Sequence, residues 1–458
     1  MSDMTKSDRL FDTEQPKERG FLVGIDMRTH RFQQGVLAVE DSLEELAALA
    51  ETAQVDVIGA TYQRLNKPNP ATLIGSGKVD ELKHFKDELD LEVFIFDDEL
   101  SPRQQRVLEK ELAVKVVDRT ALILDIFAQH ARTKEGQLQV ELAQLEYRLP
   151  RLTRMWTHLA RQSGGRAGGD TGGVGVRGPG ETQLEVDRRE IGRKIAHLKN
   201  SLEEVRVHRA GHRARRQQAH IPVVAIVGYT NAGKSTLLNT LIRRAGSDRD
   251  APLIYTADQL FATLDPTTRR IRLPEGQEVL FSDTVGFIQK LPTQLIAAFR
   301  ATLEEVREAN LLLHVIDITH PNALEQAQAV EDALEAIEAT HLPVLTAFNK
   351  IDAFDGGVAA LHAQLMGYEN CVLVSAKTGQ GIDDLLLSLE QWVIDQMVTI
   401  NICLPYKAGR LTAMLYEQGI VETERHDEQG SHFLARIPKH LLGTFEQYEE
   451  AARRPDRF

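Results

Sequence analysis

The chain has 458 residues, of which 42% are hydrophobic and 26% are charged, and its formal net charge is −13. This composition predicts a folded protein of several domains, and the negative charge argues against one that binds nucleic acid over its whole surface. Cys371 and Cys403 allow at most one disulfide, and neither a signal sequence nor an apolar run of about 18 residues occurs. We therefore expect a cytoplasmic protein without membrane insertion.

The N-terminal part predicts a disordered tail at residues 1–18 and a small parallel α/β domain at residues 19–135. Short apolar runs alternate there with amphipathic stretches, as in parallel strands joined by helices. Gly75–Lys78 matches only part of a phosphate-binding loop, because Val79 follows the lysine, and we interpret it as a turn before a helix. The predicted strands are 20–26, 55–65, 91–97 and 114–117, and the predicted helices are 42–52, 79–88, 101–112 and 121–131.

Residues 136–218 are predicted to form an antiparallel helical hairpin. Apolar residues recur at alternating spacings of four and three over 138–159 and, with one interruption by an arginine, over 184–205. Pro150 is expected to kink the first helix. The connector, residues 163–180, contains nine glycines. It is predicted to be a mobile loop that orders against RNA, with a plain flexible linker as the alternative.

A basic segment interrupts the acidic chain. Residues 148–216 contain 16 lysines and arginines against 7 acidic residues, a local charge of +9. This excess indicates one surface that faces a polyanion, whereas a solvated helix face normally mixes the two signs. The predicted RNA-binding residues are Arg166, Arg177, Arg213, Arg215 and Arg216.

The next predicted domain, residues 219–397, begins with an apolar strand followed by Gly228–Thr236. This stretch fits G-x-x-x-x-G-K-[S/T], the loop that cradles a triphosphate at the start of a helix. Lys234 is expected to reach the outer phosphates, the Ser235 hydroxyl to face Mg²⁺, and Asn231 is a candidate ligand for K⁺. The predicted phosphate-binding residues are Gly228, Tyr229, Thr230, Asn231, Ala232, Gly233, Lys234, Ser235 and Thr236.

Strands and helices continue to alternate behind this loop, which is typical of a doubly wound sheet that binds its ligand at the carboxyl ends of the strands. Residues 398–458 are expected to form a small C-terminal α+β domain that begins with a strand at 399–404. The predicted strands of the nucleotide domain are 221–227, 278–281, 311–315, 344–348 and 372–374, and the later helices are 294–308, 323–339 and 382–397.

Two short motifs after strands predict that the nucleotide is guanine. Asp352 can accept hydrogen bonds from the guanine N1–H and exocyclic amine, a donor pair that adenine lacks. Asn349 and Lys350 are expected to shape the base pocket, and Ser375 begins a loop that supports its other edge. The predicted base-binding residues are Asn349, Lys350, Ile351, Asp352, Ser375, Ala376 and Lys377.

Two further loops are predicted to sense the γ-phosphate. Asp283 suits Mg²⁺ binding through water, and the Gly286 N–H suits a phosphate contact. Thr263 is the preferred candidate for the hydroxyl that joins the metal only in the GTP state; Thr267 and Thr268, in the same predicted loop, are alternatives. The predicted residues are Phe261, Ala262, Thr263, Asp283, Thr284, Val285 and Gly286, with Lys234, Thr263 and Gly286 in catalysis.

Phe287 follows Gly286, where many GTPases have a glutamine that positions the attacking water. Phenylalanine cannot orient water by hydrogen bonding. We therefore expect slow intrinsic hydrolysis that a partner accelerates.

These motifs, together with others nearer the N-terminus, resemble those of the HflX family of ribosome-binding GTPases, in the TrmE-Era-Obg-HflX-like superfamily. The resemblance spans about residues 20–397. The residues that carry it are 69–78, 96–104, 178–185, 228–236, 261–269, 283–287 and 349–352.

The resemblance implies GTP-dependent binding to the large (50S) ribosomal subunit and its rRNA, and splitting of stalled 70S ribosomes, particularly under heat stress. It implies that the glycine-rich loop reaches toward the peptidyl-transferase region and, with less support, that the N-terminal domain binds ATP. We expect a monomer. The alternatives are a ribosome-assembly GTPase of the large subunit and a GTP-timed RNA-modifying enzyme, although no second catalytic constellation is evident outside the nucleotide domain.

Overall fold

The structure is a computed structural model that divides into two compact units, each described here by itself. The first comprises residues 1–131, 139–198 and 290–296, and the second comprises 132–138, 199–289 and 297–458. The residues described are 17–27, 38–152, 179–218, 221–245, 261, 267–290, 305–355, 368 and 370–449.

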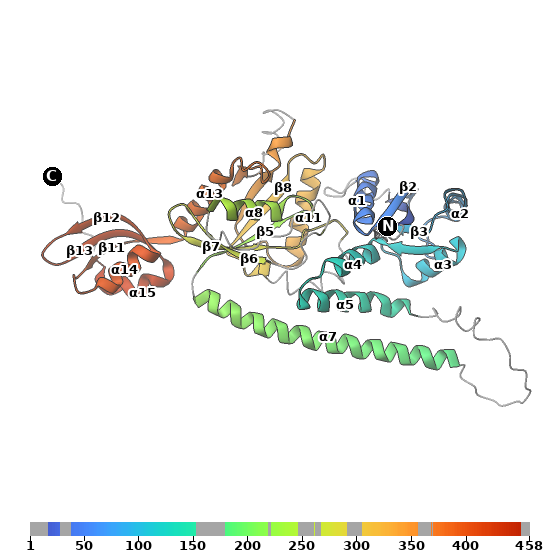
Figure 1. The fold of residues 1–458 in the computed structure, drawn as a ribbon, viewed down its shortest axis with the longest axis horizontal. Helices are drawn as coiled ribbons and strands as arrows, with labels where there is room; N and C mark the ends of the chain where they lie inside the picture. Colours follow the sequence, from blue (N-terminus) through green and yellow to red (C-terminus); the bar gives the residue numbers. More distant parts are fainter. Residues whose placement is uncertain are drawn as a thin grey trace, which may run out of the picture. The chain divides into compact units, whose positions relative to one another are not determined.

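The first unit contains a four-stranded sheet in the order β2-β1-β3-β4, with all neighbours parallel (Figure 1). All four residues of β3 are buried, as expected for a parallel strand covered on both faces. This confirms the predicted parallel α/β fold. The elements are β1 (Glu18–Met27), α1 (Val39–Thr52), β2 (Val55–Leu65), α2 (Ser76–Leu89), β3 (Val93–Phe96), α3 (Pro102–Leu112), β4 (Lys115–Asp118) and α4 (Arg119–His130).

Charged residues at the carboxyl ends of β3 and β4 have structural roles in this unit. Asp97 lies 2.7 Å from Arg119, and both side chains are buried. Asp118 caps α4 by accepting a hydrogen bond from the Ala121 N–H, and it also accepts one from the Tyr147 hydroxyl. This network explains much of the motif at residues 96–104.

The interpretation of Gly75–Lys78 as a turn before a helix was wrong in its bounds, because Ser76–Lys78 already form the first turn of α2. Gly75 is the N-cap of α2, and the Lys78 amine donates to the Thr61 hydroxyl at 2.6 Å and to Glu81 at 2.8 Å.

Two long helical segments correspond to the predicted arm: α5 (Lys134–Arg148) and α7 (Pro179–Gln218), the latter 40 residues long. Rather than bending, the helix before Pro150 ends at Arg148 and passes into the 3₁₀ turn η1 (Leu149–Arg151). Proline lacks the N–H that would continue the helix, so the α-helical ladder stops there. Residues 163–178 of the expected connector lie outside the described residues.

The second unit contains a six-stranded sheet in the order β10-β9-β8-β5-β7-β6 (Figure 1). Only β6 is antiparallel to its neighbour. Apolar residues of α8 and α13 pack on one face of the sheet and those of α11 on the other. The predicted doubly wound sheet is confirmed. The elements are β5 (Val223–Gly228), α8 (Lys234–Ala245), β6 (Thr267–Arg272), β7 (Glu278–Asp283), β8 (Leu311–Asp317), α11 (Ala323–Ala336), β9 (Val344–Asn349), η2 (Ile351–Ala353), β10 (Cys371–Leu373) and α13 (Ile382–Asp395).

The same unit ends in a three-stranded antiparallel sheet in the order β11-β13-β12. Ile402, Leu415, Phe433 and Phe445 are buried in its core, which confirms a small C-terminal α+β fold. The elements are β11 (Met397–Leu404), α14 (Gly409–Gln418), β12 (Ile420–His426), β13 (Ser431–Pro438), η3 (Lys439–Leu441), α15 (Leu442–Phe445) and η4 (Glu446–Tyr448).

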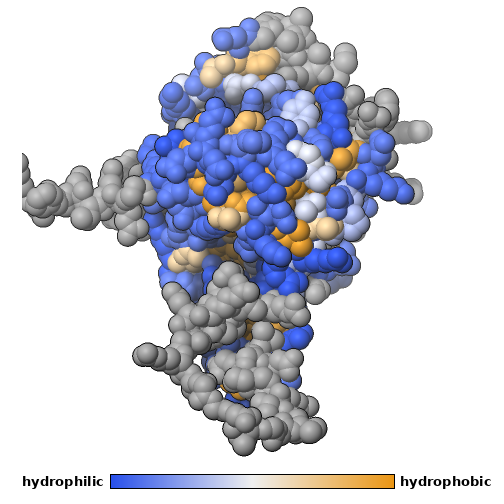
Figure 2. Space-filling view, turned by 90° about the vertical axis from the view of Figure 1, so that its right-hand side faces the viewer, coloured by the Kyte–Doolittle hydropathy of each residue, from blue (hydrophilic) through white to orange (hydrophobic). Residues whose placement is uncertain are grey.

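None of the helices in the described part of the chain combines the length and the apolar character needed to span a membrane. The face shown in Figure 2 is mostly hydrophilic, with hydrophobic residues in small areas between the polar ones.

Candidate nucleotide-binding site

The phosphate-binding loop connects β5 to α8 at the carboxyl edge of the central sheet, where such sheets bind ligands. Gly233 has a φ of +91°, and a Cβ atom built on it would lie 2.3 Å from Nδ2 of Asn349. Only glycine meets both requirements without displacing that amide. The phosphate-binding loop therefore packs directly against Asn349, one of the predicted base-binding residues, at this glycine.

Lys234 is a buried cation within this loop. Its amine donates hydrogen bonds to the carbonyl oxygens of Gly228, at 3.1 Å, and Tyr229, at 2.7 Å. Burial lowers the pKa of Lys234 to about 8, although the carboxylate of Asp283 opposes this effect. An amine held charged in this environment is suited to bind a phosphate, because the anion would compensate for lost solvation.

The lowered pKa of Lys234 predicts a pH dependence of GTP binding. Below about pH 8 the amine is protonated and attracts the triphosphate; above it, GTP can bind tightly only if the amine takes up a proton, so affinity falls as the pH rises. At pH 8 we expect uptake of about half a proton per GTP. Calorimetry in two buffers of different ionisation enthalpy measures this uptake, and a buffer-independent enthalpy would contradict the prediction.

The expected magnesium ligands meet where the loop approaches the end of β7. The Ser235 hydroxyl donates to Oδ2 of Asp283 at 2.7 Å, and Asp283 is fully buried. A hydroxyl and a carboxylate oxygen are the donors that Mg²⁺ prefers, so this pair fits the ion. When bound, Mg²⁺ would neutralise charge on the phosphates.

The region of Thr263 is only partly described. Ala262 and Thr263 lie outside the described residues, whereas Phe261 is buried with a φ of +58°. Thr267 and Thr268 belong to β6, where they pair with Asp283 and Ser282 of β7. The prediction that these two threonines lie in the loop was therefore wrong, because β6 begins at Thr267 and its ladder with β7 holds both backbones.

The segment after Asp283 is tied to the phosphate-binding loop through its backbone. The Phe287 N–H donates to the Gly228 oxygen at 3.1 Å, and the Thr230 N–H donates to the Phe287 oxygen at 2.8 Å. A Cβ atom on Gly286 would lie 2.9 Å from the Lys234 amine. The Gly286 backbone thus passes directly beside the residue expected to hold the outer phosphates.

Two side chains near this segment make hydrogen bonds that the motifs did not indicate. The Tyr229 hydroxyl accepts a hydrogen bond from the Gln289 N–H at 2.8 Å. The Thr284 hydroxyl donates to the Ile226 oxygen at 2.6 Å, so it braces β5. Val285 is half-buried, and the Phe287 ring is buried.

The predicted base-binding residues come together from β9, η2 and the loop after β10. Asn349 donates through Nδ2 to the Ala232 oxygen at 2.8 Å and accepts at Oδ1 from the Ala376 N–H at 2.9 Å. Asp352 is exposed, and its Oδ1 accepts from the Ser375 hydroxyl at 2.6 Å. Asn349 therefore joins the phosphate loop to the loop of Ser375, and Ser375 orients the Asp352 carboxylate, which is predicted to bind the base.

The other predicted base-binding residues make no hydrogen bond to the phosphate loop among the described contacts. The Lys350 amine lies 2.7 Å from Oδ2 of Asp317, a residue that sequence reasoning did not select. Ile351 is half-buried, and Lys377 is exposed. Lys350 has a φ of +66°, so this turn holds a non-glycine residue in the left-handed region.

His314 is a buried histidine in β8 that the strand pattern showed only as one polar residue in an apolar run. Burial and then the charge of Lys234 lower its pKa to about 4. The imidazole is therefore neutral near neutral pH, which keeps a second positive charge away from Lys234.

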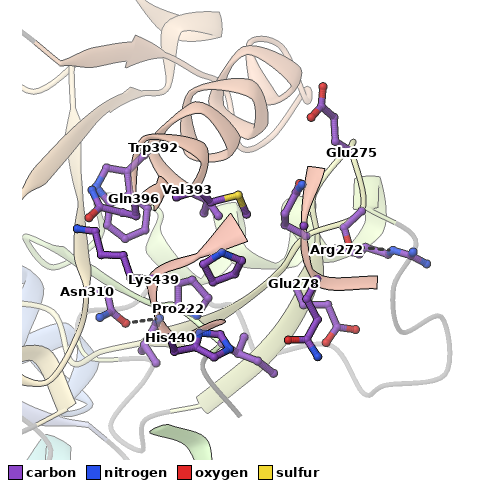
Figure 3. A pocket seen from close by; sticks show the side chains of 18 of the residues that line it. Pro222, Arg272, Glu275, Glu278, Asn310, Trp392, Val393, Gln396, Lys439 and His440 are labelled. Atoms are coloured by element: carbon purple, nitrogen blue, oxygen red, sulfur yellow. Dashed lines mark hydrogen bonds between the residues drawn. The ribbon is translucent and has the colours of Figure 1, made fainter. Parts of the chain in front are cut away.

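A cavity of about 1120 Å³ lies at the opposite, amino-terminal edge of the sheet (Figure 3). Pro222 and Glu278 mark the amino ends of β5 and β7 on its wall, and Trp392 of α13 and Lys439 of the C-terminal part face it. Asn310 there accepts a hydrogen bond from the Val223 N–H at 2.8 Å. Because the phosphate loop lies at the carboxyl edge, this cavity is separate from the nucleotide site.

The predicted RNA-binding residues cannot be placed by their side chains. Arg166 and Arg177 lie outside the described residues, and Arg213, Arg215 and Arg216 are in the last turns of α7, where only the backbone is described. Among the described side chains, no group of three or more histidine, cysteine or acidic residues could by itself hold a metal ion. Of the predicted Mg²⁺ ligands, Ser235 and Asp283 lie within the described part of the chain, and Thr263 lies outside it.

Four family models match successive parts of the chain. Their descriptions are "GTP-binding GTPase N-terminal" for residues 40–128, "GTP-binding GTPase Middle Region" for 130–216, "50S ribosome-binding GTPase" for 223–350 and "HflX C-terminal domain" for 360–439.

Curated relatives match over most of the chain. A GTPase HflX of Caldanaerobacter subterraneus is 46% identical over 421 residues, which cover 92% of this chain and 91% of the relative. The GTPase HflX of Escherichia coli is 43% identical over 399 residues, covering 87% and 90%. A solved GTP-binding protein of Sulfolobus solfataricus in complex with GDP is 24% identical, with a TM-score of 0.40, over 81% of this chain and 98% of that protein. The family models and the curated relatives place the chain in the HflX family of GTPases.

Proposed function

We propose that this GTPase binds the large ribosomal subunit in its GTP state and dissociates stalled 70S ribosomes into subunits. The observation that carries the proposal is the match of residues 223–350 to the model described as a 50S ribosome-binding GTPase. The excess of positive charge over residues 148–216 supports it, because such a segment suits contact with rRNA.

Ribosome-stimulated hydrolysis is part of this proposal. The Phe287 side chain has no hydrogen-bonding group to offer an attacking water, and its backbone N–H and oxygen are paired with Gly228 and Thr230. A contact made on the ribosome would complete the site. The nucleotide would then act as a timer that keeps the protein bound until hydrolysis releases it.

We further infer a cytoplasmic monomer that acts under heat or other stress, with Mg²⁺ at Ser235 and Asp283 and K⁺ as a second candidate ion beside Asn231. ATP binding by the N-terminal unit is not part of the proposal. Lys78, the lysine of its incomplete phosphate-loop motif, is engaged by Thr61 and Glu81.

Sucrose-gradient profiles test the proposed function directly. Purified 70S ribosomes mixed with the protein and a non-hydrolysable GTP analogue should give separate subunit peaks, with the protein in the 50S fraction. Undisturbed 70S peaks would overturn splitting. Binding only to immature large-subunit particles would favour the assembly function, and modified rRNA as the product would favour the RNA-modifying enzyme.

Shortening the glycine-rich segment 163–180 should separate GTP binding from ribosome splitting. The residues that contact the nucleotide lie elsewhere in the chain, so GTP affinity should stay within about twofold of wild type. Splitting should be lost, because the segment is proposed to reach rRNA. Fluorescent-nucleotide titration and the gradient assay measure the two properties, and normal splitting by the shortened protein would refute a role for this segment.

A further inference from the structure

An ion-pair network connects helix α7 to strand β7, which ends at Asp283, a predicted Mg²⁺ ligand. Arg209 of α7 donates through Nη1 to Oε1 of Glu305 at 3.2 Å, and its Nη2 lies 2.7 Å from Oε2 of Glu135 at the start of α5. The other oxygen of Glu305 accepts a hydrogen bond from the Ser282 hydroxyl at 3.1 Å. All these residues belong to the second unit.

The network is largely shielded from water. The side chains of Glu135, Glu305 and Arg209 are 11%, 12% and 23% exposed, and Ser282 is 1% exposed. Because water reaches these two carboxylates so little, the Arg209 guanidinium between them compensates for their lost solvation. Arginine suits this position because its planar fork can donate to both carboxylates at once, which a lysine amine does with poorer geometry.

Ser282 is the residue immediately before Asp283 in β7. Successive side chains of a strand point to opposite faces, so the Ser282 hydroxyl is held by Glu305 on one side while Asp283 meets the Ser235 hydroxyl on the other. The ladders with β5 and β6 hold the backbone at this end of β7, and the hydrogen bond from Ser282 to Glu305 adds a side-chain link from the strand to Arg209.

We propose that Arg209 is a positioning residue of the GTPase site. Through Glu305 and Ser282 it sets the position of the Asp283 carboxylate, and a displacement of α7 alters how that carboxylate engages Mg²⁺. The link from α7 to the ribosome rests on the proposed function, whereas the link from Arg209 to Mg²⁺ belongs to the protein alone.

Release of a fluorescent GDP analogue from the full-length protein tests the proposal without ribosomes and without catalysis. Mg²⁺ held by Ser235 and Asp283 would slow GDP release, so the Mg²⁺ concentration that gives half of the maximal slowing would report on this ligand pair. In Arg209→Ala this midpoint should rise about threefold, less than the roughly tenfold effect of losing a direct outer-shell partner of a metal ligand, because Arg209 acts through Glu305 and Ser282. Release in excess chelator should equal that of wild type, because the base pocket is unchanged.

The matched control is Arg206→Ala. Arg206 lies one turn earlier on the same helix and pairs with Glu203 at 3.6 Å, with both side chains more than half exposed. Its removal should leave the Mg²⁺ midpoint unchanged. Arg209→Lys should recover only part of the loss, since one amine replaces the fork.

Ser282→Ala removes only a hydroxyl and keeps the proposal falsifiable if Arg209→Ala does not fold. It should raise the Mg²⁺ midpoint in the same direction, and Arg209→Ala combined with it should add little, because both changes break one chain of contacts. A wild-type midpoint in either folded single variant would overturn the proposal. If wild-type protein fails to bind ribosomes but these shifts occur, the proposed function fails and the positioning role of Arg209 stands.

Discussion

Lys234→Met should lower GTP hydrolysis by about 10³-fold, comparable to the loss of one preorganised electrostatic contact. The buried amine lies beside the Gly286 backbone, where the outer phosphates are expected, and methionine has no charge with which to stabilise them.

The same substitution should raise the free energy of unfolding of the nucleotide-free protein. Burial lowers the pKa of Lys234 from 10.5 to about 8. The folded protein therefore loses at most roughly 3 kcal/mol of stability by keeping this amine protonated, and methionine removes that cost.

Single-turnover hydrolysis and thermal unfolding without nucleotide measure these two opposite effects. Lys83→Met is the matched control, because Lys83 is an exposed lysine of the first unit that pairs with Asp80 and Glu111. The control should leave hydrolysis unchanged. A Lys234→Met protein that is strongly destabilised without nucleotide would show that the lysine is chiefly structural.

Asp352→Asn should lower GTP affinity by about 10³-fold and improve binding of xanthosine triphosphate. A carboxylate accepts from the two donors on the guanine edge, whereas an amide presents one donor that suits the carbonyl of xanthine at the same position. Sites built around such pairs discriminate strongly, because a mismatch leaves polar groups unpaired. The Ser375 hydroxyl would still orient the side chain.

Competition titration with both nucleotides measures this exchange. Asp355→Asn changes an exposed carboxylate three residues further along and is expected to leave both affinities at the wild-type values. If Asp352→Asn keeps GTP affinity and gains nothing for the xanthine nucleotide, guanine recognition does not depend on Asp352.

Most elements of both sheets were predictable from the sequence, because their signals are local. The buried parallel strand β3 is a continuous apolar run, and Ser101 with Gln104 forms the capping box that starts α3. The phosphate loop is likewise contiguous, so its spacing alone identified it. Strand β6 was missed altogether, since its residues from Thr267 onward form a strand only by virtue of their pairing with β7.

The sequence by itself determined most of the strands and helices, the phosphate loop and the motifs that predict guanine, because each depends on residues within a few positions of one another. Only the tertiary structure decided that Asn349 holds the phosphate loop at Ala232, 117 residues away, and that Arg209 reaches Ser282 through Glu305. These contacts cross between elements, and their hydrogen bonds form only after the sheet has brought the chain segments together. A one-dimensional pattern therefore carries no signal for them.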